Sequence, residues 1–396
     1  APLSHDLGTQ GPQRAFFLER QLVLKPGESR TLYFLYGYLP NGFTVNALVA
    51  KYTADPASLW SRSSAQWKPD APLFRAPAHP WVEREALWSS YYLRSGLTYD
   101  SFFREHILSQ GAGYQYQAGI QCAARDPLQH VLPLVFTDPQ IVRQVLRYTL
   151  KEIQADGSIP YGIVGHGVPM PCVYRPSDLQ LWVLWVASEY VLATRDREFL
   201  QERIPLYPRQ EVLPNDPTVL ELLSRSFTHL NTTIGIGKHG LLKIFNGDWN
   251  DSIVYTHLTP EQRAEVFPVG ESVLNSAMAA YVFDYYACML DFIKRGELAN
   301  QSRAKASQQR EAVQSQWDRR WYRRAWLGEE LGWVGEKQMW LSPQPWALIG
   351  NCVPTEHIAT LVTSMNDLAR RPSPIGALLQ SHADPTMKDD PGTGTN

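Results

Sequence analysis

Residues 271–294 read ESVLNSAMAAYVFDYYACMLDFIK and carry the most regular apolar pattern of the 396-residue chain. Apolar side chains recur there at spacings of three and four residues, which is the period of one face of an α-helix. They are Val273, Leu274, Ala277, Met278, Tyr281, Val282, Tyr285, Met289 and Phe292. The spacing therefore predicts a long helix that packs against other helices.

Shorter segments on both sides repeat this period. One apolar stripe occupies 141–150 after Asp138, and another occupies 181–191 after Ser177, which is a candidate N-cap. Further helices are expected near 217–228, 298–320 and 355–370. Long helices joined by irregular loops rich in proline and glycine favour an α/α arrangement of packed helical hairpins, in which the loops carry the chemistry.

The N-terminal part has a different pattern. Segments 15–18, 21–24 and 31–36 resemble strands, and the turn sequence Lys25-Pro26-Gly27-Glu28 separates the last two. A lone hairpin is only marginally stable in water. These strands are therefore expected either to end a larger β-sandwich or to pack against the next part of the chain.

Composition excludes several classes of partner. The 37 basic and 39 acidic residues give a net charge of −2, so no footprint for nucleic acid or an anionic membrane is expected. No apolar run reaches the roughly 18 residues that span a bilayer. The cysteines form no C-x-x-C motif, which favours a reducing, cytoplasmic location and predicts neither a disulfide framework nor a metal site. They are Cys122, Cys172, Cys288 and Cys352.

The segment 246–252, NGDWNDS, is the most informative for chemistry. It places Asp248 and Asp251 on an irregular loop around Trp249. Cleavage of a glycosidic bond needs a carboxylic acid that protonates the leaving oxygen, groups that hold hydroxyls and an aromatic platform, and this loop supplies all three. The alternative is an Asx-rich turn whose side chains cap the local backbone.

Three other polar clusters have equally open interpretations. Arg125-Asp126 with Gln129, preceded by Gln117 and Gln121, lines either a sugar pocket or an ordinary ion pair. In Arg175-Pro176-Ser177-Asp178, Ser177 or Asp178 can simply cap the following helix. Glu271, just ahead of the longest helix, can be a partner of the helix dipole.

Taken in order, these segments resemble glycoside hydrolase family 94, which contains disaccharide phosphorylases such as cellobiose phosphorylase and the phosphorylase-like domain of cyclic β-1,2-glucan synthases. The resemblance covers most of the chain from about residue 80 to 350. The segments that carry it are 117–119, 125–129, 175–178 with 181–182, 239–241, 247–251, 270–273, 321–325 and 344–347.

The resemblance implies an (α/α)6 barrel over residues 81–396, incomplete at its C-terminus. Residues 1–60 would be the C-terminal part of the family's β-sandwich domain, and residues 61–80 a linker. Segment 392–396 looks like the approach to the family's phosphate-binding region. His130 stands where the family usually has an aspartate.

The activity that the resemblance implies is inverting phosphorolysis of a β-glucosidic bond in a disaccharide or short glucan, giving an α-sugar 1-phosphate. Asp251 falls on the family's general acid, Asp126 on a residue that binds sugar hydroxyls, and Trp249 on the same subsite. The other expected substrate-binding residues are Arg125, Gln129, Asp178, Asp248, Asn250, Glu271 and Gln344. Inorganic phosphate is the expected co-substrate, no cofactor is expected, and a homodimer is among the expected partners because family members often form dimers.

Two alternatives stay open. The first is an inverting hydrolase, in which Glu271 would act as a general base at about 6.5–9.5 Å from the acid. The second is a non-catalytic carbohydrate-binding relic, suggested by His130 and by the early end of the chain.

Overall fold

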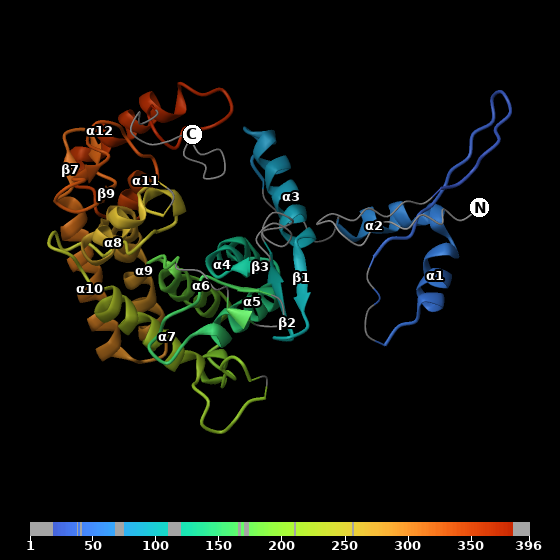
Figure 1. Ribbon diagram of the computed structural model, residues 1–396, viewed down its shortest axis with the longest axis horizontal. Coiled ribbons are helices and arrows are strands. Elements are labelled where there is room, and N and C mark those ends of the chain that lie inside the picture. The colour runs from blue at the N-terminus through green and yellow to red at the C-terminus, as the bar shows by residue number, and fades with distance from the viewer. Residues whose placement is uncertain are drawn as a thin grey trace. The chain divides into compact units, whose positions relative to one another are not determined.

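The computed structural model describes residues 19–37, 39, 42–67, 75–109, 120–164, 168–169, 174–209, 211–255 and 257–382. The chain divides into two compact units, residues 1–70 and 71–396. Figure 1 shows the elements of both units in chain order. Within the described residues no helix is long and apolar enough to cross a membrane.

The first unit has helices that the sequence did not predict, and they follow the segments where strands were expected. It contains α1 (Val45–Thr53), the 3-10 turn η1 (Pro56–Ser58) and α2 (Leu59–Trp67). The predicted turn forms, because the Glu28 N–H donates to the Lys25 carbonyl at 2.9 Å.

The predicted strands do not form beside this turn. The described residues of this unit include no strand, so the strands predicted at 21–24 and 31–36 are wrong, while segment 15–18 lies outside the described residues. The apolar side chains of both segments are exposed, and no third strand is described for them to pair with. That residues 1–60 belong to a β-sandwich domain stays a prediction.

The second unit is mainly helical, as the sequence predicts. Its helices are α3 (Pro80–Ser95), α4 (Arg125–Val131), α5 (Pro139–Glu152), α6 (Leu179–Thr194), α7 (Val219–His229), α8 (Pro260–Val269), α9 (Val273–Phe292), α10 (Gly296–Gln314), α11 (Pro343–Ile349) and α12 (Thr355–Met365). The 3-10 and π turns are η3 (Leu132–Phe136), η5 (Phe199–Gln201), η6 (Leu230–Ile234), η7 (Asp251–Ile253) and η8 (Asn366–Arg370).

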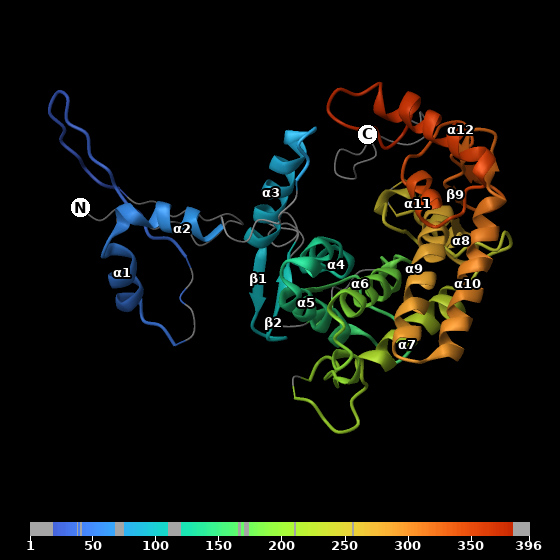
Figure 2. The same ribbon diagram turned by 180° about the vertical axis from the view of Figure 1, so that it is seen from behind.

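Helix α9 is the centre of this unit. It packs along α10 and also contacts α6 and α11, and Figures 1 and 2 show it between α6 and α10 in both views. It begins at Val273, two residues later than the apolar pattern suggested, because the Ser272 side chain accepts the Asn275 N–H at 3.0 Å and so forms the N-cap. The main core joins buried side chains of α4, α5, α6, α7 and α9.

Other predicted helices differ mainly at their ends. The stripe at 141–150 lies in α5, and the segment 217–228 corresponds to α7. The helix predicted at 298–320 is wrong at its C-terminal end, because α10 stops at Gln314 and the chain turns into a short hairpin. Ser177 is not the cap of α6. Asp178 occupies that position and directs its carboxylate to Arg125 instead.

Small sheets hold the loops around these helices. They are built from β1 (Leu97–Asp100), β2 (Glu105–Leu108), β3 (Ile120–Ala123), β4 (Gly162–Val164), β5 (Val168–Pro169), β6 (Glu271–Ser272), β7 (Trp317–Asp318), β8 (Trp321–Tyr322), β9 (Ala325–Trp326) and β10 (Trp333–Val334). The antiparallel order β10-β9-β6 matters most. Because β6 immediately precedes α9 and pairs with β9, it brings Arg324 beside the start of α9, where the Val273 N–H donates to the Arg324 carbonyl at 3.2 Å.

Candidate functional site

Loop 246–252 is fixed against the chain segment that leads into α6. The Arg175 N–H donates to Asn246 Oδ1 at 2.6 Å, and the Ser177 N–H donates to the Gly247 carbonyl at 3.0 Å. Gly247 is required here because a Cβ atom at this position would overlap the Tyr174 hydroxyl. The two segments, some seventy residues apart in the chain, therefore meet at one place.

Arg125 is the centre of the polar network. Its Nη1 donates to Asp178 Oδ1 and Oδ2 at 3.0 and 3.2 Å and to the Asp248 carbonyl at 2.8 Å, while Nη2 contacts Asp251 Oδ1. Trp182 Nε1 donates to Asp178 Oδ2 at 3.1 Å, so both partners of the buried ion pair are held in place. Burial opposes the charge of Arg125, but Asp178 and Asp251 outweigh it and raise the pKa of the guanidinium well above its ordinary value.

Asp251 is the accessible member of this network. Its side chain is 36% exposed, whereas that of Arg125 is 4% exposed. The Tyr174 hydroxyl donates to Oδ1 at 2.5 Å, and the Tyr161 hydroxyl lies 3.4 Å from Oδ2. Trp249, two residues earlier, is 43% exposed. The loop thus exposes a carboxyl group and an indole ring to solvent, while the residues that hold the loop in place are buried and hydrogen-bonded.

Asp126 lies in the first turn of α4, next to Arg125. Burial raises the pKa of its carboxyl group to about 6, and the nearby charge of Asp251 adds to this effect while Arg125 opposes it. Gln129 lies one turn further along the same helix, at the i+3 position from Asp126. These predicted sugar-binding residues therefore share one helix face beside the network.

Asp248 has a structural role rather than the predicted sugar contact. Its carboxylate is fully buried and bidentate with Arg324, at 2.6 and 2.7 Å, and it also accepts from the Ser272 hydroxyl at 2.7 Å. Burial opposes the charge, but Arg324 and these hydrogen bonds lower the pKa of Asp248 below its ordinary value. The loop therefore has two aspartates with different surroundings, one buried and paired and the other accessible.

Glu271 is equally inaccessible, which corrects its prediction as a sugar contact or as a general base. It is fully buried and accepts from the backbone N–H groups of His239 and Leu241, and the His239 ring lies 2.8 Å from Oε1. A Cβ at Gly237 would overlap its side chain, so the surrounding turn closes directly over the carboxylate. Glu271 therefore holds the 237–241 turn against the start of α9.

Gln344 and Asn250 also bind the local backbone. Gln344 is fully buried, accepts from the Tyr322 N–H at 2.9 Å and donates to the Tyr322 and Trp340 carbonyls at 2.8 Å. Asn250 accepts from the Ser252 N–H at 3.0 Å and caps η7. The capping interpretation thus holds for Asn250, and Gln344 has no accessible amide for a sugar.

Sequence reasoning did not select three residues of this network, namely Tyr161, Tyr174 and Arg324. Arg324 lies in a segment that supports the family resemblance, but no pattern in the sequence indicates that it pairs with Asp248, which is 76 residues away.

Some of the predicted site residues lie outside the part of the chain that the structure describes. Gln117, the segment 392–396 and the side chain of Gln121 are outside the described residues. In the part of the chain that the structure describes, no group of three His, Cys, Asp or Glu residues could hold a metal ion.

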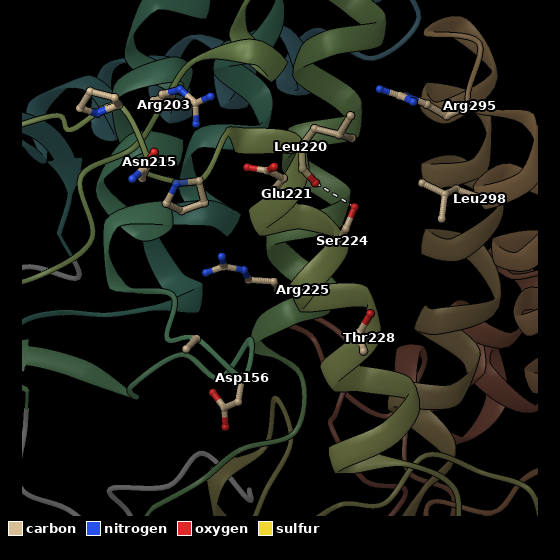
Figure 3. A pocket seen from close by; sticks show the side chains of 13 residues that line it. Asp156, Arg203, Asn215, Leu220, Glu221, Ser224, Arg225, Thr228, Arg295 and Leu298 are labelled. Carbon is tan, nitrogen blue, oxygen red and sulfur yellow. Dashed lines mark hydrogen bonds between the residues drawn. The ribbon is translucent and has the colours of Figure 1, made fainter.

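A cavity of about 870 Å³ lies apart from this network, between α7, the N-terminal end of α10 and the loops before them. Figure 3 shows Arg203, Arg225 and Arg295 around it, together with Asp156 and Glu221. None of the residues of the Arg125 network lines it. Since its walls carry both signs of charge, the cavity has no clear electrostatic preference.

Comparison with known proteins gives the family context for this site. A solabiose phosphorylase from Paenibacillus borealis is 26% identical over 383 residues, which are 92% of this chain and 44% of that protein. A 3-O-beta-D-glucopyranosyl-beta-D-glucuronide phosphorylase from the same organism is 21% identical and covers 89% of this chain and 43% of its own length. The chain therefore spans less than half the length of these relatives.

The solved structures resemble this chain only with low TM-scores. A rhamnosidase from Klebsiella oxytoca with rhamnose bound matches with a TM-score of 0.41 and 15% identity, over 63% of this chain and 41% of its own. A GH78 rhamnosidase of Bacillus sp. GL1 matches with a TM-score of 0.47 and 13% identity, over 64% of this chain and 23% of its own.

The match to a protein family is more extensive than these structural similarities. Residues 172–395, more than half of the chain, match the catalytic domain of the glycosyl hydrolase 94 superfamily. This range contains Asp178 and the whole of loop 246–252, whereas Arg125 and Asp126 precede it. The chain therefore belongs to the glycosyl hydrolase 94 superfamily.

Proposed function

We propose that this chain is the catalytic part of a phosphorylase that cleaves a β-glucosidic bond of a disaccharide or short glucan with inversion, using inorganic phosphate and producing an α-sugar 1-phosphate. The observation that carries the proposal is the accessible Asp251 carboxyl group, held by Arg125 and Tyr174 within the segment that matches the family's catalytic domain. Two relatives named as phosphorylases support it.

In this mechanism Asp251 is the general acid. It donates its proton to the glycosidic oxygen while a phosphate oxygen attacks C1 from the opposite face of the sugar. The bond between C1 and the glycosidic oxygen breaks, its electron pair stays on the departing oxygen, and that oxygen takes the proton. Because phosphate is already anionic, the reaction needs no second carboxylate as a base.

The neighbouring residues have supporting roles in this proposal. Asp126 and Gln129 bind sugar hydroxyls, and the exposed ring of Trp249 supports a sugar face. Arg125 keeps the Asp251 carboxyl group in place and is itself held by Asp178. A hydrolytic alternative loses its only proposed base, because Glu271 is fully buried and bonded to the 237–241 turn.

We also propose that the second unit is part of an (α/α)6 barrel. The family membership and the consecutive helices α9 and α10, which pack along each other, support this architecture. A homodimer remains an expectation from the family resemblance.

The test is an assay of the full chain with α-D-glucose 1-phosphate and a panel of acceptor sugars, in which released phosphate is measured. The forward reaction is then run on the disaccharide formed, with and without inorganic phosphate. We expect sugar 1-phosphate only when phosphate is present. Release of free glucose without phosphate would contradict phosphorolysis, and sugar binding without any turnover would favour the non-catalytic relic.

The variant that tests the role of Asp251 is Asp251→Asn, which keeps the size of the side chain but cannot supply the proton. We expect it to lower the rate by about 10²–10⁴-fold, which is the usual contribution of a general acid. A variant that retains wild-type turnover would show that the acid is misassigned.

A further inference from the structure

A second cavity, of about 510 Å³, lies directly beside loop 246–252. One wall is a single face of α8, formed by Pro260, Arg263, Ala264 and Phe267. Positions i, i+3, i+4 and i+7 point to the same side of a helix, so these four side chains line the cavity together. The opposite wall comes from the segment around Arg175 and from the start of the loop, and Tyr255 completes the lining.

The charge of this cavity is one-sided. Its lining contains Arg175 and Arg263 and no carboxylate, in contrast to the mixed cavity beside α7 (Figure 3). Within the described ranges, neither of the two arginines makes an ion pair with an acidic side chain. Glu261, on the first turn of α8, interacts electrostatically with Arg263, but its side chain does not line the cavity. The N-terminal end of α8 adds a further positive potential.

Arg263 is held in a fixed orientation. Its Nη1 donates to the Tyr255 carbonyl at 3.1 Å, and its guanidinium lies 4.8 Å from the centre of the Tyr255 ring. A guanidinium fixed in this way keeps further N–H groups that match the geometry of a carboxylate or phosphate. Phe267 is similarly fixed, because its ring stacks on Phe245 at 4.7 Å. The walls thus combine one preorganised guanidinium, that of Arg263, with aromatic surface.

The cavity is also connected to the candidate acid. Asn246, in its lining, is the first residue of the loop that carries Asp251. Tyr255 packs edge-to-face on Tyr174 at 5.2 Å, and the hydroxyl of Tyr174 donates to Asp251. The rings of Tyr255 and Tyr174 therefore link this cavity to the Asp251 carboxyl group.

We propose that this cavity is a subsite for an acidic sugar, with Arg175 and Arg263 binding its oxyanion and Tyr255 and Phe267 contacting its ring. Cavities of about 300–1,000 Å³ suit small ligands, and a sugar offers both an apolar C–H face and an anionic group when it carries a carboxylate or a phosphate. The proposal rests on the proposed function, since it assigns an acidic sugar as one part of the substrate.

Binding is tested separately from turnover by using the Asp251→Asn chain. Isothermal titration calorimetry compares D-glucuronate, D-glucose 6-phosphate, inorganic phosphate and D-glucose. We expect the affinity for the two acidic sugars to depend on Arg175 and Arg263, whereas binding of glucose and inorganic phosphate, which the proposed function assigns to the catalytic site, should not depend on them. A preference for glucuronate or for the sugar phosphate identifies which oxyanion the subsite takes, and either preference supports the proposal.

The variants Arg175→Met and Arg263→Met should each weaken binding of the acidic sugar by about tenfold or more. Arg225→Met, in the separate cavity, is the matched control and should leave binding unchanged. Tight binding of both acidic sugars by a folded double variant, or an equal loss of binding in the Arg225→Met control, would overturn the proposal; circular dichroism checks that the variants are folded. These results do not depend on phosphorolysis, so a failure of the subsite and a failure of the proposed function remain distinguishable.

Discussion

The two oxygens of the Asp251 carboxyl group have unlike surroundings. Oδ1 is in contact with Arg125 and accepts the Tyr174 hydroxyl at 2.5 Å, whereas Oδ2 has, among the described residues, the Tyr161 hydroxyl at 3.4 Å as its partner. Burial raises the pKa of Tyr174 well above its ordinary value, so its hydroxyl remains a donor. If Asp251 is the acid, its proton therefore belongs on Oδ2, and Tyr174 is a positioning residue.

The change Tyr174→Phe should lower kcat about 10–100-fold and leave KM within about threefold, because a misoriented acid slows proton transfer without changing sugar contacts. Tyr161→Phe is the matched control, and its longer contact predicts an effect on kcat below about threefold. Steady-state kinetics on both variants, with thermal unfolding as a check of folding, makes the comparison. Equal effects of the two changes would show that Tyr174 has no special role.

Glu152, at the end of α5, leads to a prediction about stability. It is 2% exposed, and its Oε2 has no hydrogen-bond partner among the described residues. Burial, with a smaller contribution from Asp100, raises the pKa of its carboxyl group well above the ordinary value. A raised folded-state pKa means that the stability contributed by Glu152 is fully present below the unfolded value of about 4.5 and is lost as the pH rises above it.

The variant Glu152→Gln should therefore gain on the wild type by up to about 1.4 kcal/mol in the free energy of unfolding per pH unit above about pH 4.5. Urea unfolding at pH 4.5, 6 and 7.5 measures the difference. A difference that does not change with pH would mean that Glu152 is ionised in the folded protein.

At the scale of single elements, the start of α9 combines two tasks in one side chain. Ser272 caps the helix by accepting the Asn275 N–H, and its hydroxyl also donates to the buried carboxylate of Asp248. Thr218 caps α7 in an exposed capping box with Glu221 and has no such second partner among the described contacts. A comparison of the two caps therefore distinguishes the stability that comes from helix capping from the stability that comes from the hydrogen bond between Ser272 and Asp248.

Replacing Thr218 by alanine should cost about 1 kcal/mol, the usual value of an N-cap. Ser272→Ala should cost about 2–3 kcal/mol, because a buried carboxylate also loses a donor. Chemical denaturation of both variants gives the two values. Equal losses would indicate that the bond to Asp248 contributes little to stability.

The elements that the sequence predicts well are those with a local, repeated signal. Helices α5 and α7 repeat their apolar spacing on one face, whereas α6 and α9 are long apolar segments that are buried on nearly every face, and both patterns are local properties of the sequence. The strands β6 and β9 have two residues each and no period at all. The pairing of Arg324 with Asp248 depends on these strands, so the buried role of Asp248 was not foreseeable.

At the scale of the whole chain, the family and the mainly helical class were predictable because motif order and apolar spacing are properties of the sequence itself. The accessibility of each polar residue was not. Asp248, Asp251, Glu271 and Gln344 all lie in segments that support the resemblance, yet only Asp251 among them is accessible. Motif position therefore indicates where a site lies, whereas burial determines which of its residues can touch a ligand.

Buried side chains are distributed unevenly between the two units. The buried members of the apolar core clusters lie between Phe103 and Leu361, and the described part of residues 1–70 contains no buried side chain. The Arg125 network also lies wholly in the second unit. The second unit is therefore expected to fold on its own.

A chain that begins at Ala71 should unfold cooperatively, with a Tm within about 3 °C of the full chain, since little buried apolar area is lost. A chain that ends at Pro354 is the matched control. It loses α12 with the buried Leu361, and its Tm should fall by several degrees more. Differential scanning calorimetry makes both measurements, and non-cooperative unfolding of the chain that begins at Ala71 would show that residues 1–70 are needed for the fold of the second unit.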